Sequence, residues 1–224
     1  MNRYPNWGAT DSELTRAMIG DFLIPAPTYR ATLAVTVDAG PEQIWPWLVQ
    51  MGYRRGGLYS YDWLDRLFGF LDRPSADGIL PEYQHLSVGD EIPIGRGRGF
   101  PVREIAPGRA LVLGGKAGDF EWIWQFGLYP LDGGRTRIVS RNTARIPKTL
   151  SWRLFMSALK PAAFLMTRRM LIGLKRRAER LAIQRHQQGD GREKPAGLIL
   201  GSVNTSVLQS RPRTAPSTVG ARAT

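Results

Sequence analysis

The pattern of apolar and polar positions is most regular near the C-terminus, between residues 151 and 187. Apolar side chains recur there every three or four residues, so they fall on one stripe of a helix. The stripe consists of Phe164, Met170, Leu171, Leu174, Ala178 and Leu181. Because such a helix is stable only when its apolar stripe is buried, the pattern predicts a long C-terminal helix packed on another layer.

The preceding part of the chain shows the alternation that is typical of β-strands. Residues 31–37 alternate and are rich in β-branched side chains, and two longer strand-like runs follow at 120–131 and 136–145. The sequence Asp-Gly-Gly-Arg at 132–135 suits the turn of a hairpin between those runs. Gly and Pro separate three further short candidates. These candidates are 91–94, 100–105 and 110–113. The pattern predicts an antiparallel meander.

Short helices are predicted on both sides of the first strand. Thr10 and Glu13 have the spacing of a capping box, which indicates a helix start. Pro41 suits the first position of a second helix, and Ser60 is expected to cap a third, which ends at Gly69. After a short lead-in, the predicted order is one strand, two helices, several antiparallel strands and one long helix. This order is that of an α+β helix-grip fold.

Several segments resemble a bacterial branch of the SRPBCC superfamily, which includes START-like lipid-binding domains and polyketide cyclases. The similar segments are 44–52, 59–64, 80–82, 88–91 and 130–136. The resemblance extends over roughly residues 8–186. It implies a curved antiparallel β-sheet wrapped around the long C-terminal α-helix, with a cavity for an apolar ligand between them. Because that scaffold serves binders, carriers and enzymes alike, function has to be argued from the site.

The length of 224 residues suits one domain with additional segments. We expect an N-terminal lead-in over 1–29, the helix-grip domain over 30–187 and a basic tail over 188–224. The tail is rich in Gly, Pro, Ser, Thr and Arg without a sustained period, which predicts disorder. The chain has no cysteine, no apolar leader at its N-terminus and no uncharged run of membrane-spanning length. These features favour a cytoplasmic protein.

The net charge of +12 is concentrated in the last third of the chain. Residues 1–150 hold 17 Lys and Arg against 16 Asp and Glu, whereas residues 151–224 hold 14 against 3. The polar side of the long helix is therefore a basic face, made of Arg168, Arg169, Lys175, Arg176 and Arg180. This face suggests peripheral contact with an acidic membrane surface or recruitment of an acidic partner. Nucleic acid is not expected, because no recognised nucleic-acid module is present.

Aromatic residues are the most informative candidates for ligand binding. Trp122, Trp124 and Phe126 occupy every second position of a predicted strand, so they share one face of the sheet. Other rings cluster around the two short helices. The candidate ligand residues are Trp47, Tyr59, Tyr61, Trp63, Trp122, Trp124, Phe126 and Arg141. The rings could line an apolar cavity or form a plain aromatic core. Arg141 could hold a carboxylate or phosphate in the cavity, or lie on the outer face of the sheet.

Three residues are candidates for acid–base catalysis: Asp62, Glu82 and His85. A cyclase or dehydratase needs such a group near a substrate carbonyl. In the ordinary alternative, Asp62 favours the helix dipole, Asp65 is solvated and His85 caps a loop. No cofactor is expected, and metal binding has little support with two distant histidines and no cysteine. The leading hypothesis is therefore a binder of a small apolar or lipid-like ligand, with a cyclase-type enzyme and a basic-helix adaptor as alternatives.

Overall fold

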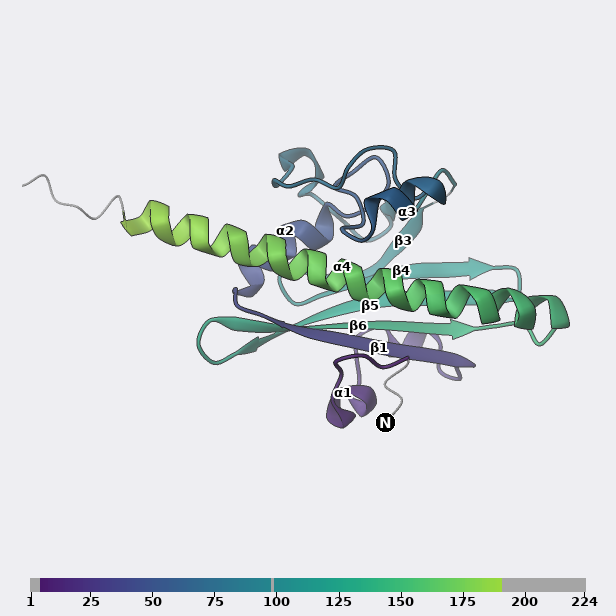
Figure 1. The fold of residues 1–224 in the computed structure, drawn as a ribbon. Coiled ribbons are helices and arrows are strands. Elements are labelled where there is room, and N and C mark those ends of the chain that lie inside the picture. Colours follow the sequence, from purple (N-terminus) through teal and green to yellow (C-terminus); the bar gives the residue numbers. More distant parts are fainter. Residues whose placement is uncertain (1–4, 98, 191–224) are drawn as a thin grey trace, which may run out of the picture.

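The computed structural model describes residues 5–97 and 99–190 (Figure 1). Helices and strands follow the predicted order. The elements are α1 (Asp11–Thr15), η1 (Asp21–Leu23), β1 (Tyr29–Val37), α2 (Pro41–Val49), α3 (Asp62–Leu67), η2 (Pro81–Tyr83), β2 (Glu91–Ile92), β3 (Phe100–Ala106), β4 (Ala110–Ala117), β5 (Phe120–Leu131), β6 (Arg135–Arg145) and α4 (Leu150–Asp190). The α+β fold class predicted from the sequence is confirmed.

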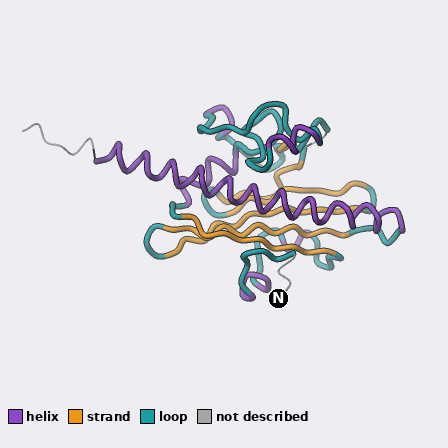
Figure 2. The backbone as a smooth tube through the Cα atoms, in the orientation of Figure 1, coloured by secondary structure: helices purple, strands orange, loops and turns teal. Residues whose placement is uncertain are grey.

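The strands form one six-stranded antiparallel sheet in the order β1-β6-β5-β4-β3-β2. The predicted hairpin joins β5 to β6, and its turn holds Gly133 and Gly134 at φ angles of 74° and 70°. Only glycine adopts this left-handed conformation at little cost, which explains the pair of glycines there. Helix α4 crosses one face of the sheet along its length, as Figure 2 shows with the strands behind the helix. This arrangement is the helix-grip topology.

The second half of α4 is held to the sheet by the stripe that the sequence predicts. Met170, Leu171, Leu174 and Ala178 are buried in one cluster with residues of the sheet and α2. A side chain at Gly173 would place its Cβ 2.1 Å from the carbonyl oxygen of Tyr59, so glycine is required where the helix meets this loop. Pro161 lies inside α4 without ending it.

The opposite face of the sheet is covered by the N-terminal segment. Met18 packs against Ala34 and Val139, and a second small cluster joins Ile24 to Val112 and Ile123 of the inner strands. In Figure 1 this segment, with α1, lies across the sheet from α4. The predicted lead-in therefore forms a second covering layer, and the sheet is buried on both faces.

Two predictions about single helices differ from the structure. Ser60 does not cap α3, because the N-cap is Tyr61 and the Ser60 hydroxyl instead donates a hydrogen bond to Asp65. Helix α4 continues to Asp190, so residues 188–190 of the predicted tail are helical. The remainder of that predicted disordered tail lies outside the described residues.

Candidate functional site

An aromatic ladder runs along β5 on the face that α4 covers. Its rungs are Phe120, Trp122, Trp124 and Phe126, at every second residue of the strand. Trp122 stacks on Trp124 with ring centroids 6.2 Å apart, and Trp124 contacts Phe126 at 5.0 Å. Exposure changes along the ladder: Phe126 is 0% exposed and Trp124 7%, whereas Trp122 and Phe120 are only half-buried. The ladder thus leads from the core toward solvent.

The outer end of the ladder meets the beginning of α4. The ring of Trp152 stacks on Phe120 at 4.9 Å between centroids, and Phe155 meets Trp152 edge-on at 5.6 Å. A hollow of about 330 Å³, open to solvent, is lined there by Ser151, Trp152 and Phe155. Phe120 continues the period-two pattern that had identified the other rungs, so it could have been found from the sequence. Trp152 and Phe155 could not, because only the fold brings Trp152 onto Phe120, with Phe155 beside it.

The polar edges of the ladder are already occupied within the protein. The indole N–H of Trp122 donates to Asn142 Oδ1 and that of Trp124 to Ser140 Oγ, both at 2.9 Å. Both acceptors belong to the neighbouring strand β6. These bonds fix the ring planes. Trp122 also meets Phe100 edge-on at 4.7 Å, and Trp124 is only 7% exposed, so the accessible ring surface belongs to the half-buried Trp122 and Phe120.

Trp47 and Tyr59 lie deeper, under the second half of α4, and their rings meet edge-on at 6.0 Å. The Tyr59 hydroxyl donates to the Trp47 carbonyl, and the guanidinium of Arg177 lies over the Tyr59 ring. Burial raises the pKa of Tyr59 above its ordinary value. Tyr59 also adopts a left-handed backbone with φ of 56°, which is uncommon for an aromatic residue. These two predicted site residues belong to the packed core under α4.

The two remaining aromatic candidates lie at the surface end of the 59–67 segment. Tyr61 is half-buried beneath the guanidinium of Arg169, 5.4 Å from its ring centroid. Trp63, on α3, is 68% exposed. The prediction that Trp63 lines an interior cavity is therefore wrong, because the short helix α3 turns this ring outward.

Arg141 lies on the face of the sheet opposite α4, so the prediction that it binds a ligand in the cavity is also wrong. Its side chain is fully buried under the N-terminal segment. One amino group bonds the carboxylate of Asp21 at 2.6 Å and the carbonyl of Arg16 at 2.9 Å, and the other bonds the carbonyl of Glu13 at 2.6 Å. Burial lowers the pKa of Arg141, and the Asp21 carboxylate partly offsets this. The residue fastens the N-terminal segment to the sheet.

The three predicted catalytic residues are not brought together into a cavity. The Asp62 carboxylate accepts hydrogen bonds from the backbone N–H and the hydroxyl of Ser75, at 3.0 and 2.7 Å. Glu82 and His85 are exposed, at and just after the short helix η2. Their placement therefore matches the ordinary structural alternative better than an acid–base site.

The one buried acid of this region is Asp65, which the sequence had suggested was solvated. Its side chain is 0% exposed and accepts a hydrogen bond from the Ser60 hydroxyl, while its Oδ1 atom has no partner among the described residues. Burial, together with the nearby Asp62 carboxylate, raises the pKa of Asp65 to about 6. The signal for this burial is tertiary, since α3 by itself is too short to show a buried face.

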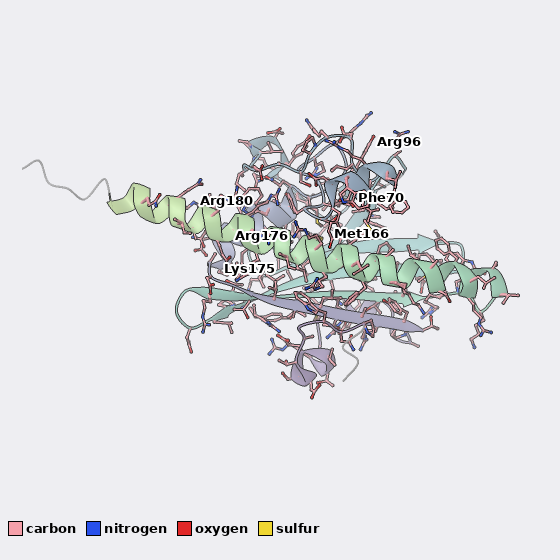
Figure 3. All side chains as sticks on the ribbon, in the orientation of Figure 1. Phe70, Arg96, Met166, Lys175, Arg176 and Arg180 are labelled. Carbon is pink, nitrogen blue, oxygen red and sulfur yellow. The ribbon has the colours of Figure 1, made fainter. Side chains whose placement is uncertain are left out.

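Most of the predicted basic face is engaged within the protein. Arg168 lies over the ring of Trp7 and Arg169 over that of Tyr61. Lys175 bonds the carbonyl of Thr36, and it also pairs with Glu179 on its own helix. The exposed members are Arg176 and Arg180. Figure 3 shows Lys175, Arg176 and Arg180 along the second half of α4.

Residues 5–97 and 99–190 contain neither a candidate metal-binding cluster nor a candidate membrane-spanning helix. In that part of the chain, no group of three or more His, Asp or Glu side chains could hold a metal ion. Nor is any helix of the same residues both long and apolar enough to cross a bilayer.

Comparison with solved structures finds proteins of similar topology. The aromatase/cyclase Zhui from Streptomyces sp. R1128 has 15% identity and a TM-score of 0.42, over 68% of this chain and 94% of its own. Protein CV1439 from Chromobacterium violaceum has 17% identity and a TM-score of 0.42, over 68% and 99%. The hypothetical protein jhp0584 from Helicobacter pylori has 12% identity and a TM-score of 0.44, over 72% and 95%.

One of these neighbours is named an aromatase/cyclase, and the other two are named without an activity. No protein-family model matches the chain, and no curated protein matches it. With identities of 12–17% and TM-scores below 0.5, the likeness concerns the fold alone and carries no argument about function. The helix-grip assignment rests on the strand order and the placement of α4 in this chain.

Proposed function

We propose that this protein binds a small apolar or lipid-like ligand against the outer end of the aromatic ladder, in the open hollow at the first two turns of α4. The observation that carries the proposal is the continuity of the rings. They run from the buried Phe126 to the half-buried Phe120 and end at a hollow lined by Trp152 and Phe155. Rings that are not needed to fill the core offer surface to another molecule.

The chemistry of the hollow favours an apolar ligand. Two of its three lining residues, Trp152 and Phe155, are aromatic. The outer end of the ladder offers ring surface rather than polar groups, because Phe120 and Trp122 are half-buried and the Trp122 N–H is held by β6. A ligand with a flat or branched hydrocarbon surface would therefore gain from burial here, and its polar end would remain at the open rim.

The two alternative functions draw less support from the described residues. A cyclase or dehydratase would need a catalytic acid or base beside the rings, yet Asp62 is bonded to Ser75, and Glu82 and His85 are exposed. An adaptor working through the basic face would have few cations available, since Arg168, Arg169 and Lys175 are engaged with the protein itself. Neither alternative explains the ladder.

The test combines identification of a ligand with a matched pair of variants. Native mass spectrometry of the full chain should show bound apolar species, and the fluorescent probe 1-anilinonaphthalene-8-sulfonate should bind the protein after these are removed. Trp152→Ala should weaken probe binding about tenfold, because truncation of a central aromatic contact costs more than 1 kcal/mol. The control is Phe22→Ala, which removes an exposed ring on the opposite side of the sheet.

Unchanged probe affinity in Trp152→Ala would contradict the proposed site, as would an equal loss in Phe22→Ala. Urea unfolding of all three proteins shows whether each variant is folded under the binding conditions. If Trp152→Ala unfolds, Phe155→Ala provides the same test, because Phe155 is 55% exposed and its loss leaves the core intact.

A further inference from the structure

The first half of α4 exposes a row of leucines on the side that faces away from the sheet. Leu150, Leu154 and Leu165 are 69%, 66% and 51% exposed. At 100° per residue they fall within a sector of roughly 60°, opposite the buried Met156 and Met170. Phe155 and Leu159 are also exposed, but at about 140° and about 180° from Leu150 they lie outside this sector. Three exposed leucines along about 22 Å of one helix form an apolar row of the kind that marks an interaction surface.

The second half of α4 continues the same outer face with cations. Arg176 falls within about 20° of Leu165 around the helix axis, and Arg180 lies one turn farther along. Both guanidinium groups are exposed (Figure 3). Residues 148–178 contain eight Lys and Arg and no Asp or Glu. The outer face of this helix therefore exposes leucines over its first half. Over its second half it exposes Arg176, Arg180 and Ile183, while Glu179 is paired with Lys175.

We infer that α4 lies flat on the surface of an anionic lipid bilayer, with the leucine row at the acyl boundary and Arg176 and Arg180 at the headgroups. An interfacial helix binds through buried apolar area together with attraction to anionic lipids, and this face supplies both. Membrane binding would leave the packing of α4 on the sheet unchanged, because the lipid-facing residues are not those of the buried stripe.

The charges on this face also favour an anionic bilayer over a second copy of the chain as its partner. Two molecules packed through the outer face of α4 would bring Lys and Arg against Lys and Arg, with no acid between residues 148 and 178 to pair with them. An anionic bilayer offers a complementary charge and an apolar layer next to it. The bilayer is therefore the occupant that fits both halves of the face.

This inference does not depend on the proposed ligand site, since Leu154 and Leu165 face away from the ladder. It also differs from contact through the whole predicted basic face, because most of those cations are engaged within the protein. The surface consists instead of the outward leucines and the two exposed arginines.

Vesicle co-sedimentation of the full chain tests the inference. Vesicles of phosphatidylcholine mixed with phosphatidylserine in equal amounts should bind the protein, and vesicles of phosphatidylcholine alone should bind it clearly less. The double variant Leu154→Glu with Leu165→Glu should lose at least about tenfold in binding, because two apolar anchors are replaced by anions. Arg176→Gln with Arg180→Gln should lose about fivefold for each charge removed.

Phe22→Glu is the matched control, since it places an acid at an exposed ring on the opposite side of the sheet and should leave vesicle binding nearly unchanged. Three results would overturn the inference: no sedimentation of the wild-type chain with anionic vesicles, equal binding to both kinds of vesicle, or equal losses in the control. A dimer in size-exclusion chromatography that the leucine variant dissociates, without vesicle binding, would assign this face to a second copy. The arginine variant keeps the test valid if the leucine variant does not fold.

Discussion

The two faces of the sheet are covered in opposite ways. On one face, the N-terminal segment is fastened by charged groups: Arg141 reaches Asp21 and the carbonyls of Glu13 and Arg16, and Arg137 binds the Glu13 carboxylate at 2.7 Å. On the other face, α4 lies over a ladder of rings that ends in an open hollow. The N-terminal layer combines these directional bonds with two small apolar clusters, whereas α4 is held mainly by the large apolar core.

The difference bears on where the proposed ligand would bind. A buried guanidinium needs its hydrogen-bond partners at fixed positions, so the segment that supplies them is fixed as well. An aromatic ring has no such requirement, and it gains similarly from contact with protein or with a ligand. The buried charge therefore fixes the N-terminal segment, and the outer end of the ring face is where we propose that another molecule binds.

The largest loss of stability is expected when the contacts of Arg141 with the N-terminal segment are removed. Arg141→Met should lower the free energy of unfolding by about 3–5 kcal/mol, because it leaves Asp21 and several carbonyls without their partner. The control Arg145→Met removes an arginine whose side chain is 45% exposed in its pair with Glu121, and it should cost at most about 1 kcal/mol. Urea unfolding measures both. Equal losses would show that the N-terminal segment is not fastened through Arg141.

A somewhat smaller loss is expected where α4 is anchored on the face with the rings. Gly173→Ala would bring a Cβ to 2.1 Å from the Tyr59 carbonyl oxygen, which forces α4 and the loop apart. We expect a cost of about 2–3 kcal/mol in urea unfolding, as for overpacking of a core. Gly78→Ala is the control, since its Cβ would meet nothing within 4 Å. A neutral Gly173→Ala would mean that α4 can shift on the sheet without loss.

The buried acid Asp65 should make the free energy of unfolding depend on pH. Because the pKa of Asp65 rises from 3.8 to about 6 on folding, the folded state binds more protons in that window. The free energy of unfolding should therefore fall as pH rises through the window, by about 3 kcal/mol at most. Asp65→Asn should remove this dependence and raise stability near pH 7 by about 1–2 kcal/mol.

Urea unfolding at about pH 4 and about pH 7 tests this dependence on the wild type and on Asp65→Asn. The pKa of Glu13 provides an internal contrast. Burial raises it, but the Arg137 and Thr10 hydrogen bonds outweigh burial and lower it overall, so Glu13 stabilises the fold at neutral pH and loses that contribution in acid. An unchanged slope in Asp65→Asn between the two pH values would show that Asp65 does not carry the effect.

The smallest effect on stability is expected at the rim of the hollow. Phe155→Ala should change the free energy of unfolding by about 0.5 kcal/mol or less, because the ring is 55% exposed. The same variant should nevertheless weaken binding of an apolar probe. A large loss of stability in this variant would place Phe155 in the core rather than at a binding site.

The sequence predicted burial correctly where apolar residues recur with the period of a strand or a helix. The alternation of β5 placed Trp122, Trp124 and Phe126 on one face, and the helical stripe identified the buried residues around Leu174. It did not predict the positions of individual polar residues or of residues outside such a pattern. Arg141 follows the same alternation as its neighbours, but which face of the sheet α4 covers cannot be read from the alternation itself.

The sequence by itself determined the order of the elements, the α+β class, the hairpin between β5 and β6 and the burial of the α4 stripe, because each depends on residues close together in the chain. Only the tertiary structure decided that the N-terminal segment covers the second face, that Asp65 is buried and that Trp152 completes the ladder. Those features depend on contacts between segments far apart in sequence, such as the stacking of Trp152 on Phe120 and the bonds from Arg141 to residues 13–21. No local pattern encodes which distant partner a side chain will meet.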